Sequence, residues 1–146
     1  MASLTRSVTI DRPIEDVFAV VTDVTKTGQW FPGDVVETWT TPPPHGVGSV
    51  RHAVVMVMGR RSENDATVIE FDPPHHGVMA GEQQGVKWTA TVACAEVEGG
   101  TRLDMFFEAK AGGAMRLFLG PFATWYGNSW TTGLANLKRM MESGEL

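Results

Sequence analysis

The stretch VKWTATVACAEVEGGTRLDMFFEAKA, residues 86–111, decides the fold class of this chain. Apolar residues take every second position in both of its halves: Val86, Trp88, Ala90, Val92 and Cys94 in the first, then Leu103, Met105, Phe107 and Ala109 in the second. This alternation is typical of β-strands with one covered and one solvent-facing side. Gly99-Gly100 lies between the halves and predicts a tight hairpin turn, so the stretch is expected to form two antiparallel strands.

The whole segment from 34 to 111 has the same character. Short runs rich in Val, Thr, Trp and Phe alternate with turn signals such as PPPHG at 42–46, MGR at 58–60, DPPHHG at 72–77 and QQG at 83–85. Turn segments this short between the apolar runs predict an antiparallel meander of about six strands. Residues 4–10 also alternate and predict one further strand at the start of the chain.

Helical patterns flank this meander. Apolar spacing predicts a short helix from Pro13 to Val21, and a second helical turn over 24–30 ends at Pro32. A long helix is predicted from Phe122 to Ser143, about 33 Å in length, and Gly120-Pro121 is expected to break the chain before it. The order of elements predicts an α+β fold with the helices on one face of one sheet. A sheet bent around a long helix must fill its middle with large side chains or leave a cavity.

Composition excludes several classes of protein. The chain has 146 residues, a size typical of one domain spanning 1–146, and 42% of its residues are hydrophobic. Its formal net charge of −5 argues against nucleic acid as a partner. One cysteine, no signal-peptide pattern and no apolar run of about 18 residues predict a cytoplasmic protein without an integral membrane segment. The sequence does not indicate the oligomeric state.

Short motifs follow one another along nearly the whole chain: RPIEDVF (12–18), TD (22–23), WFPG (30–33), GVGS (46–49), MGRR (58–61), EFDPP (70–74), GGTR (99–102) and the helix end at 134–142. In this order they resemble the polyketide cyclase/dehydrase and lipid-transport family of the START and Bet v 1-like (SRPBCC) superfamily. The resemblance implies a helix-grip fold: a curved seven-stranded antiparallel sheet around a long C-terminal helix, with two short helices after the first strand and a deep cavity. Its members bind lipids, quinones or polyketides, and some catalyse aromatic cyclisation and dehydration. Their catalytic groups differ between subfamilies, so none is transferred to this chain.

Three residues are candidates for chemistry. Arg51 and His52 lie side by side in the apolar run 50–58, so one of them must face the interior of a regular strand. An inward arginine would bind a carboxylate or enolate oxygen, and an inward histidine would act as a general base. Alternatively, an acid such as Glu63 or Glu70 neutralises the inward residue. Both faces of the run are apolar, so the sequence leaves the choice open.

Tyr126, the sole tyrosine, is the third candidate. Its hydroxyl would either donate a hydrogen bond to a ligand carbonyl or lie in water at the cavity mouth. The residues expected to bind the ligand are Trp30, Arg51, Trp88, Phe107, Phe122, Tyr126 and Trp130, although aromatic residues at such spacing also build ordinary cores. Residues 115–119 are predicted to form either a helical lid over the cavity or a plain extension of the helix. The adjacent His75 and His76 lack metal-ligand spacing, and we expect no metal and no cofactor.

The leading functional hypothesis is binding, or transport, of a hydrophobic small molecule. The first alternative is an aromatic polyketide cyclase or dehydratase in which Arg51 or His52 acts with Tyr126 on an enolate. The second alternative is a protein-interaction adaptor on the same fold. Two ionisable side chains that converge inside a cavity would favour the enzyme, whereas a filled core and an exposed apolar patch would favour the adaptor.

Overall fold

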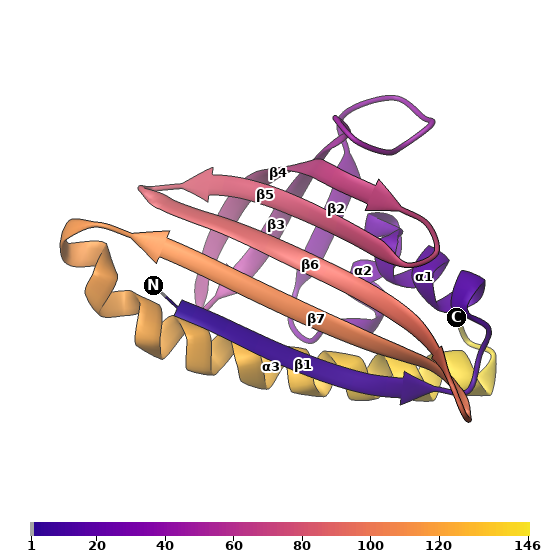
Figure 1. The fold of residues 1–146 in the computed structure, drawn as a ribbon. Helices are drawn as coiled ribbons and strands as arrows, with labels where there is room; N and C mark the ends of the chain where they lie inside the picture. Colours follow the sequence, from indigo (N-terminus) through magenta and orange to yellow (C-terminus); the bar gives the residue numbers. More distant parts are fainter. Residues whose placement is uncertain (1) are drawn as a thin grey trace.

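A seven-stranded antiparallel sheet is the framework of the computed structural model, which describes residues 2–146 (Figure 1). The strands are β1 (Ala2–Ile10), β2 (Val35–Trp39), β3 (Val50–Val57), β4 (Arg60–Asp72), β5 (His76–Gln83), β6 (Val86–Val97) and β7 (Gly100–Ala111). Their order in the sheet is β1-β7-β6-β5-β4-β3-β2, so six consecutive strands form a meander and β1 closes it against β7. This confirms the predicted meander and the additional N-terminal strand.

The β6–β7 hairpin carries the alternating pattern that predicted it. Ala90 pairs with Phe107 and Cys94 with Leu103, so the apolar residues of both strands share the concave face. The turn lies one residue earlier than predicted, because Val97 already pairs with Gly100 and the two connecting residues are Glu98 and Gly99.

Two short helices follow β1, as predicted. They are α1 (Ile14–Thr22) and α2 (Thr27–Trp30), joined by a 3-10 turn over Val24–Lys26. The chain leaves α2 through Phe31 and Pro32, where the expected stop occurs.

The C-terminal helix α3 (Arg116–Ser143) is longer than predicted and continues through Pro121, so the expected break at Gly120-Pro121 was wrong. Pro121 is the sixth residue of α3 and is exposed. A proline near the start of a helix removes one backbone hydrogen bond, and its ring can lie in solvent. The helix α3 therefore continues through Pro121 without a break. Gly144, with φ of +85°, ends α3.

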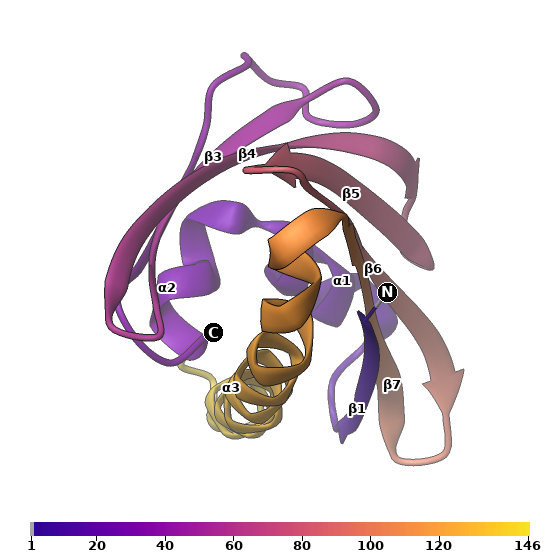
Figure 2. The ribbon, with the colours of Figure 1, turned by 90° about the vertical axis from the view of Figure 1, so that its left-hand side faces the viewer.

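The sheet curls around α3, which packs on β1 and β7 (Figure 2). One core cluster joins α1 to the C-terminal half of α3 through residues such as Val17, Leu103, Leu137 and Met141. A second cluster joins β1 and β7 to the N-terminal half of α3 through Met105, Phe107 and Leu119. Both clusters lie at the β1–β7–β6 side, and α2 packs against β2 at the opposite edge of the sheet. Within residues 2–146, no helix is long and apolar enough to cross a membrane.

Candidate functional site

A pocket of about 1210 Å³ occupies the space between α3 and the concave face of β2 to β6. Its walls are mostly aromatic and aliphatic, as in sites for small hydrophobic molecules. All seven residues expected to bind the ligand line it: Trp30, Arg51, Trp88, Phe107, Phe122, Tyr126 and Trp130. The structure brings them together; whether they contact a ligand stays a prediction.

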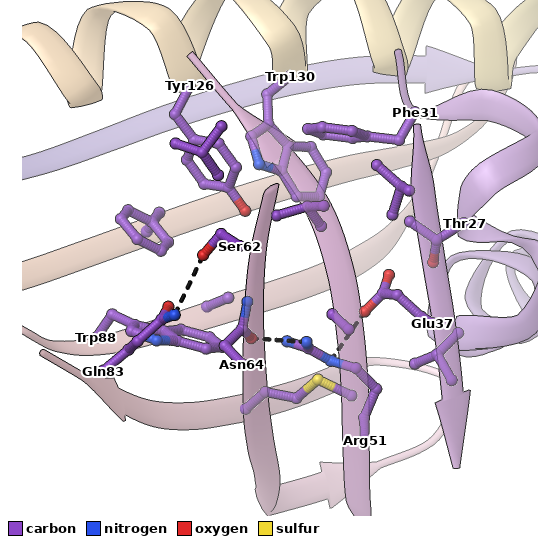
Figure 3. Close-up of a pocket in the computed structure, with 18 of the residues that line it drawn as sticks. Thr27, Phe31, Glu37, Arg51, Ser62, Asn64, Gln83, Trp88, Tyr126 and Trp130 are labelled. Carbon is purple, nitrogen blue, oxygen red and sulfur yellow. Dashed lines mark hydrogen bonds and ion pairs between the residues drawn. The ribbon is translucent and has the colours of Figure 1, made fainter. Parts of the chain in front are cut away.

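An ion pair forms the polar floor of this pocket (Figure 3). Arg51 Nε lies 2.8 Å from Glu37 Oε2, and the Arg51 Nη1 group donates a hydrogen bond of 2.8 Å to Asn64 Oδ1. Glu37 and Asn64 pair with Ala53 from either side, and Arg51 is two residues from Ala53 along β3. Three adjacent strands therefore direct these side chains to the same face, because residues two apart on a strand point the same way.

The pair is well shielded from solvent: the exposed fraction is 8% for the Arg51 side chain and 13% for that of Glu37. Burial raises the pKa of Glu37 above its ordinary value, while Arg51 and a hydrogen bond from Thr27 act in the opposite direction. Glu37 is thus a carboxyl group whose proton affinity is set by a balance between dehydration and its cation.

His52 lies on the opposite face of β3, so the structure does not support it as a candidate for chemistry in the pocket. Its Nδ1 is 2.7 Å from Asp65 Oδ1, and its Nε2 is 3.5 Å from Glu63 Oε1. The hydrogen bond with Asp65 is the main cause that raises the pKa of His52. Arg51 is the inward residue of the two.

The acid that neutralises Arg51 is Glu37, which was not among the acids expected from the sequence, Glu63 and Glu70. A signal was present: Glu37 stands between Val35 and Trp39 at the spacing of one strand face, and both neighbours also line the pocket. A single charged residue within an apolar face of a strand is expected to have a buried partner.

Trp88 lies flat against β5 because its neighbour there has no side chain. Gly81 pairs with Trp88, and a Cβ at Gly81 would come within 2.5 Å of the indole ring. The guanidinium carbon of Arg51 lies 5.7 Å from the centre of the Trp88 ring, a cation–π distance. One side of the pocket floor is therefore a stack in which the Trp88 ring lies between Gly81 and the Arg51 guanidinium.

The helix α3 supplies an aromatic wall opposite this floor. Tyr126 lies 4.8 Å from Phe107 and 5.3 Å from Phe122, measured between ring centres, while Trp130 contacts Phe31 at 5.2 Å. In Figure 3 the Tyr126 hydroxyl points from this wall into the pocket. Burial is the main cause that raises the pKa of Tyr126, so the phenol is uncharged at neutral pH.

The mouth of the pocket is bordered by the start of α3 and the β3–β4 turn. Met115, Phe118 and Leu119 line it from the first, and Met58 lines it from the second. Residues 115–119 form no separate lid helix. Met115 ends a 3-10 turn, and residues 116–119 are the first turn of α3. Of the two predicted alternatives, a lid or a plain extension of the helix, the structure has the extension. Phe118 is nevertheless 62% exposed beside the opening.

The cysteine of the chain, Cys94, lies in the core and does not line the pocket. Burial raises the pKa of the Cys94 thiol to about 11, as expected for an unreactive core cysteine. Within residues 2–146, no three His, Cys, Asp or Glu side chains are grouped so that they could hold a metal ion.

Comparison with known proteins agrees with this architecture. The family model described as polyketide cyclase/dehydrase and lipid transport matches residues 1–142. The chain belongs to this family. No curated protein matches the sequence significantly.

Solved structures share the fold of this family member at low sequence identity. A protein from Thermus thermophilus superposes with a TM-score of 0.81 at 13% identity, covering 99% of this chain and 100% of that one. A protein from Rhizobium leguminosarum superposes with a TM-score of 0.70 at 23% identity, covering 97% of this chain and 95% of that one. The di-domain ARO/CYC BexL, from the BE-7585A biosynthetic pathway, gives 0.75 at 18% identity, with 97% of this chain and 47% of BexL covered. This chain thus spans about half of BexL.

Proposed function

We propose that this protein binds a hydrophobic small molecule in the pocket between α3 and the sheet. The pocket itself carries the proposal: about 1210 Å³ lies between α3 and the sheet, opens at a mouth and is lined mostly by apolar and aromatic side chains. Concave apolar pockets with a few placed polar groups are typical of sites for small molecules. An adaptor with a filled core would show no such space.

Apolar contact supplies the affinity and the polar floor supplies orientation. Each Å² of apolar ligand surface removed from water contributes about 25 cal/mol. Several large rings, among them Trp88, Phe107 and Phe122, are placed to make that contact. The pocket is large enough for a molecule of three or four fused rings or for a folded acyl chain, which are typical of the lipids and polyketides in the family's description.

Blocking the pocket should abolish binding. Ala90 lies on the concave face of β6 and lines the pocket, so Ala90→Phe places a ring where the ligand would lie. We expect the affinity for fluorene, followed by quenching of tryptophan fluorescence, to fall at least about ten-fold. Native mass spectrometry of the freshly purified wild-type protein should show a retained apolar molecule that the variant lacks.

The same strand offers a matched control. Ala95 is exposed and an odd number of residues from Ala90, so Ala95→Phe adds the same ring to the outer face of β6. This variant should bind fluorene like wild type. Equal affinity in Ala90→Phe and wild type would refute the pocket as the binding site.

A second candidate function is aromatic polyketide cyclisation or dehydration, and the convergence of Glu37, Arg51 and Tyr126 in the pocket favours it. A carboxylate can remove a proton from a carbon between two carbonyls, and a guanidinium can stabilise the enolate oxygen that forms. Glu37 and Arg51 are in contact, so a substrate must enter between them or displace one from the other for both roles to operate.

This candidate makes a separable prediction. If Glu37 is a general base, Glu37→Gln should lower the rate of ring closure of a poly-β-ketone thioester by about a hundred-fold or more, with fluorene affinity nearly unchanged. The product is followed by the absorbance of the new aromatic ring. Glu63→Gln, on the outer face, is the control and should keep the wild-type rate. Absence of ring closure by the wild-type protein would leave binding as the function.

A further inference from the structure

The polar groups of the pocket differ in whether their hydrogen bonds are already made. On the floor, Arg51 is occupied by Glu37 and Asn64, and the Gln83 amide donates to Ser62 Oγ at 3.1 Å. On the α3 wall, Trp130 Nε1 is buried and makes no hydrogen bond within residues 2–146. Trp30 Nε1 on α2 and Arg51 Nε, which faces the Glu37 carboxylate, are the other buried nitrogens without a hydrogen bond among residues 2–146. The uncharged donors left for a ligand are therefore the two indole N–H groups, one on α2 and one on α3.

The rings of Trp130 and Tyr126 contact each other edge to face on the α3 wall. They are four residues apart on α3, their ring centres are 6.2 Å apart, and the ring planes are perpendicular. The indole N–H of Trp130 lies on the side of the Tyr126 hydroxyl (Figure 3) and makes no hydrogen bond among the residues that the structure describes, yet its nearness opposes the rise of the Tyr126 pKa that burial causes. An indole N–H can only donate. If it donates to the phenol oxygen, the hydrogen of the phenol is free to point into the pocket.

The charge balance of the floor argues against an acidic ligand. Glu37 already neutralises Arg51 at 2.8 Å, so a carboxylate would have to displace Glu37 and leave two carboxylates within one apolar cavity. Like charges at short distance in a poorly solvated site are costly. An uncharged ligand meets no such barrier.

We propose that the pocket selects an uncharged ligand with a carbonyl oxygen, which accepts a hydrogen bond from Tyr126 while the Trp130 indole holds that hydroxyl in its donating orientation. Tyr126 is then a ligand-binding residue and Trp130 a positioning residue. The chain of bonds runs from the indole N–H to the phenol oxygen and from the phenol hydrogen to the ligand, and such chains strengthen each other. Ketones, quinones and esters with a large apolar body fit this description. The inference rests on the proposed binding function.

A matched set of ligands tests it. Fluorene, fluorenone and fluorenecarboxylate share one ring system and carry no polar group, a carbonyl and a charged carboxylate, respectively. Wild type should bind fluorenone about 2–10-fold more tightly than fluorene, the range of one net hydrogen bond, and should bind the carboxylate least. In Tyr126→Phe the preference for fluorenone over fluorene should fall to a ratio of about one, with fluorene affinity retained.

The infrared carbonyl stretch of bound fluorenone gives a readout that a purely structural role would not move. Hydrogen bonding lowers this frequency, so it should be lower in wild type than in Tyr126→Phe, and Trp130→Phe should shift it part of the way. Ala95→Phe, which adds an aromatic ring on the outer face of β6, is the control and should keep the wild-type frequency and preference.

The outcomes separate the two proposals. Equal affinity of wild type for fluorenone and fluorene, an unchanged preference in Tyr126→Phe, or tightest binding of the carboxylate would each overturn the inference while leaving the binding function in place. Failure of all three ligands to bind would overturn the binding function and the inference with it.

Discussion

Gly100→Ala is expected to destabilise the fold strongly, although the change adds one methyl group. Gly100 has φ of +129°, and a Cβ built there would lie 2.1 Å from the backbone oxygen of Ile10 and 2.9 Å from its carbonyl carbon. Backbone strain at such an angle costs about 1–3 kcal/mol, and overpacking costs a similar amount. We therefore expect a loss of about 2–6 kcal/mol in the free energy of unfolding, measured by denaturant titration. The clash matters because β1 closes the sheet next to this residue.

The preceding glycine provides the control for this prediction. Gly99 also has a positive φ, +89°, but a Cβ there would meet no atom within 4 Å. Gly99→Ala should therefore show only the strain of the left-handed conformation, about 1–2 kcal/mol. If the two variants are equally stable, close approach of β1 is not what requires glycine at position 100.

The sheet could be predicted from the sequence because its signals are local. Alternation along residues 86–111 fixed which side chains share the concave face, and turn residues marked each hairpin. The predicted helix break at Pro121 was wrong because it assumed that Pro121 lies in a helix interior, where proline is costly. Proline is better tolerated near the start of a helix, and Pro121 lies there. The sequence does not show that a 3-10 turn at Gly113–Met115 already begins the helix.

The candidate site was less accessible to sequence reasoning. Its aromatic residues could be chosen because they are large and lie at core spacing. The direction of Arg51 could not, since β3 is apolar on both faces and a shift of one residue exchanges Arg51 with His52. Glu37, Asn64 and the stacking of Trp88 on Gly81 depend on which strands lie side by side, and only the register shows that.

Breaking the buried ion pair should destabilise the protein in a way that depends on pH. Arg51→Met leaves Glu37 in the pocket without its cation, a change that costs about 3 kcal/mol at neutral pH for a pair this well shielded. Burial already raises the pKa of Glu37 in the folded state, and loss of Arg51 raises it further. A group whose folded pKa is raised stabilises most below its unfolded pKa and loses that contribution as pH rises through the folded pKa. The variant should therefore be least stable at neutral and alkaline pH and approach wild type toward the unfolded value of 4.5.

A double variant distinguishes the charge from the shape of Arg51. Glu37→Gln combined with Arg51→Met removes both charges and keeps similar volumes, and replacing a buried pair by uncharged groups is often neutral. We expect it to recover most of the stability that Arg51→Met loses at neutral pH and to lose the dependence on pH above 4.5. Chemical denaturation at several pH values measures both effects. If the double variant is as unstable as Arg51→Met at every pH, packing of the guanidinium on Trp88, rather than its charge, explains the loss, because that contact is absent from both variants.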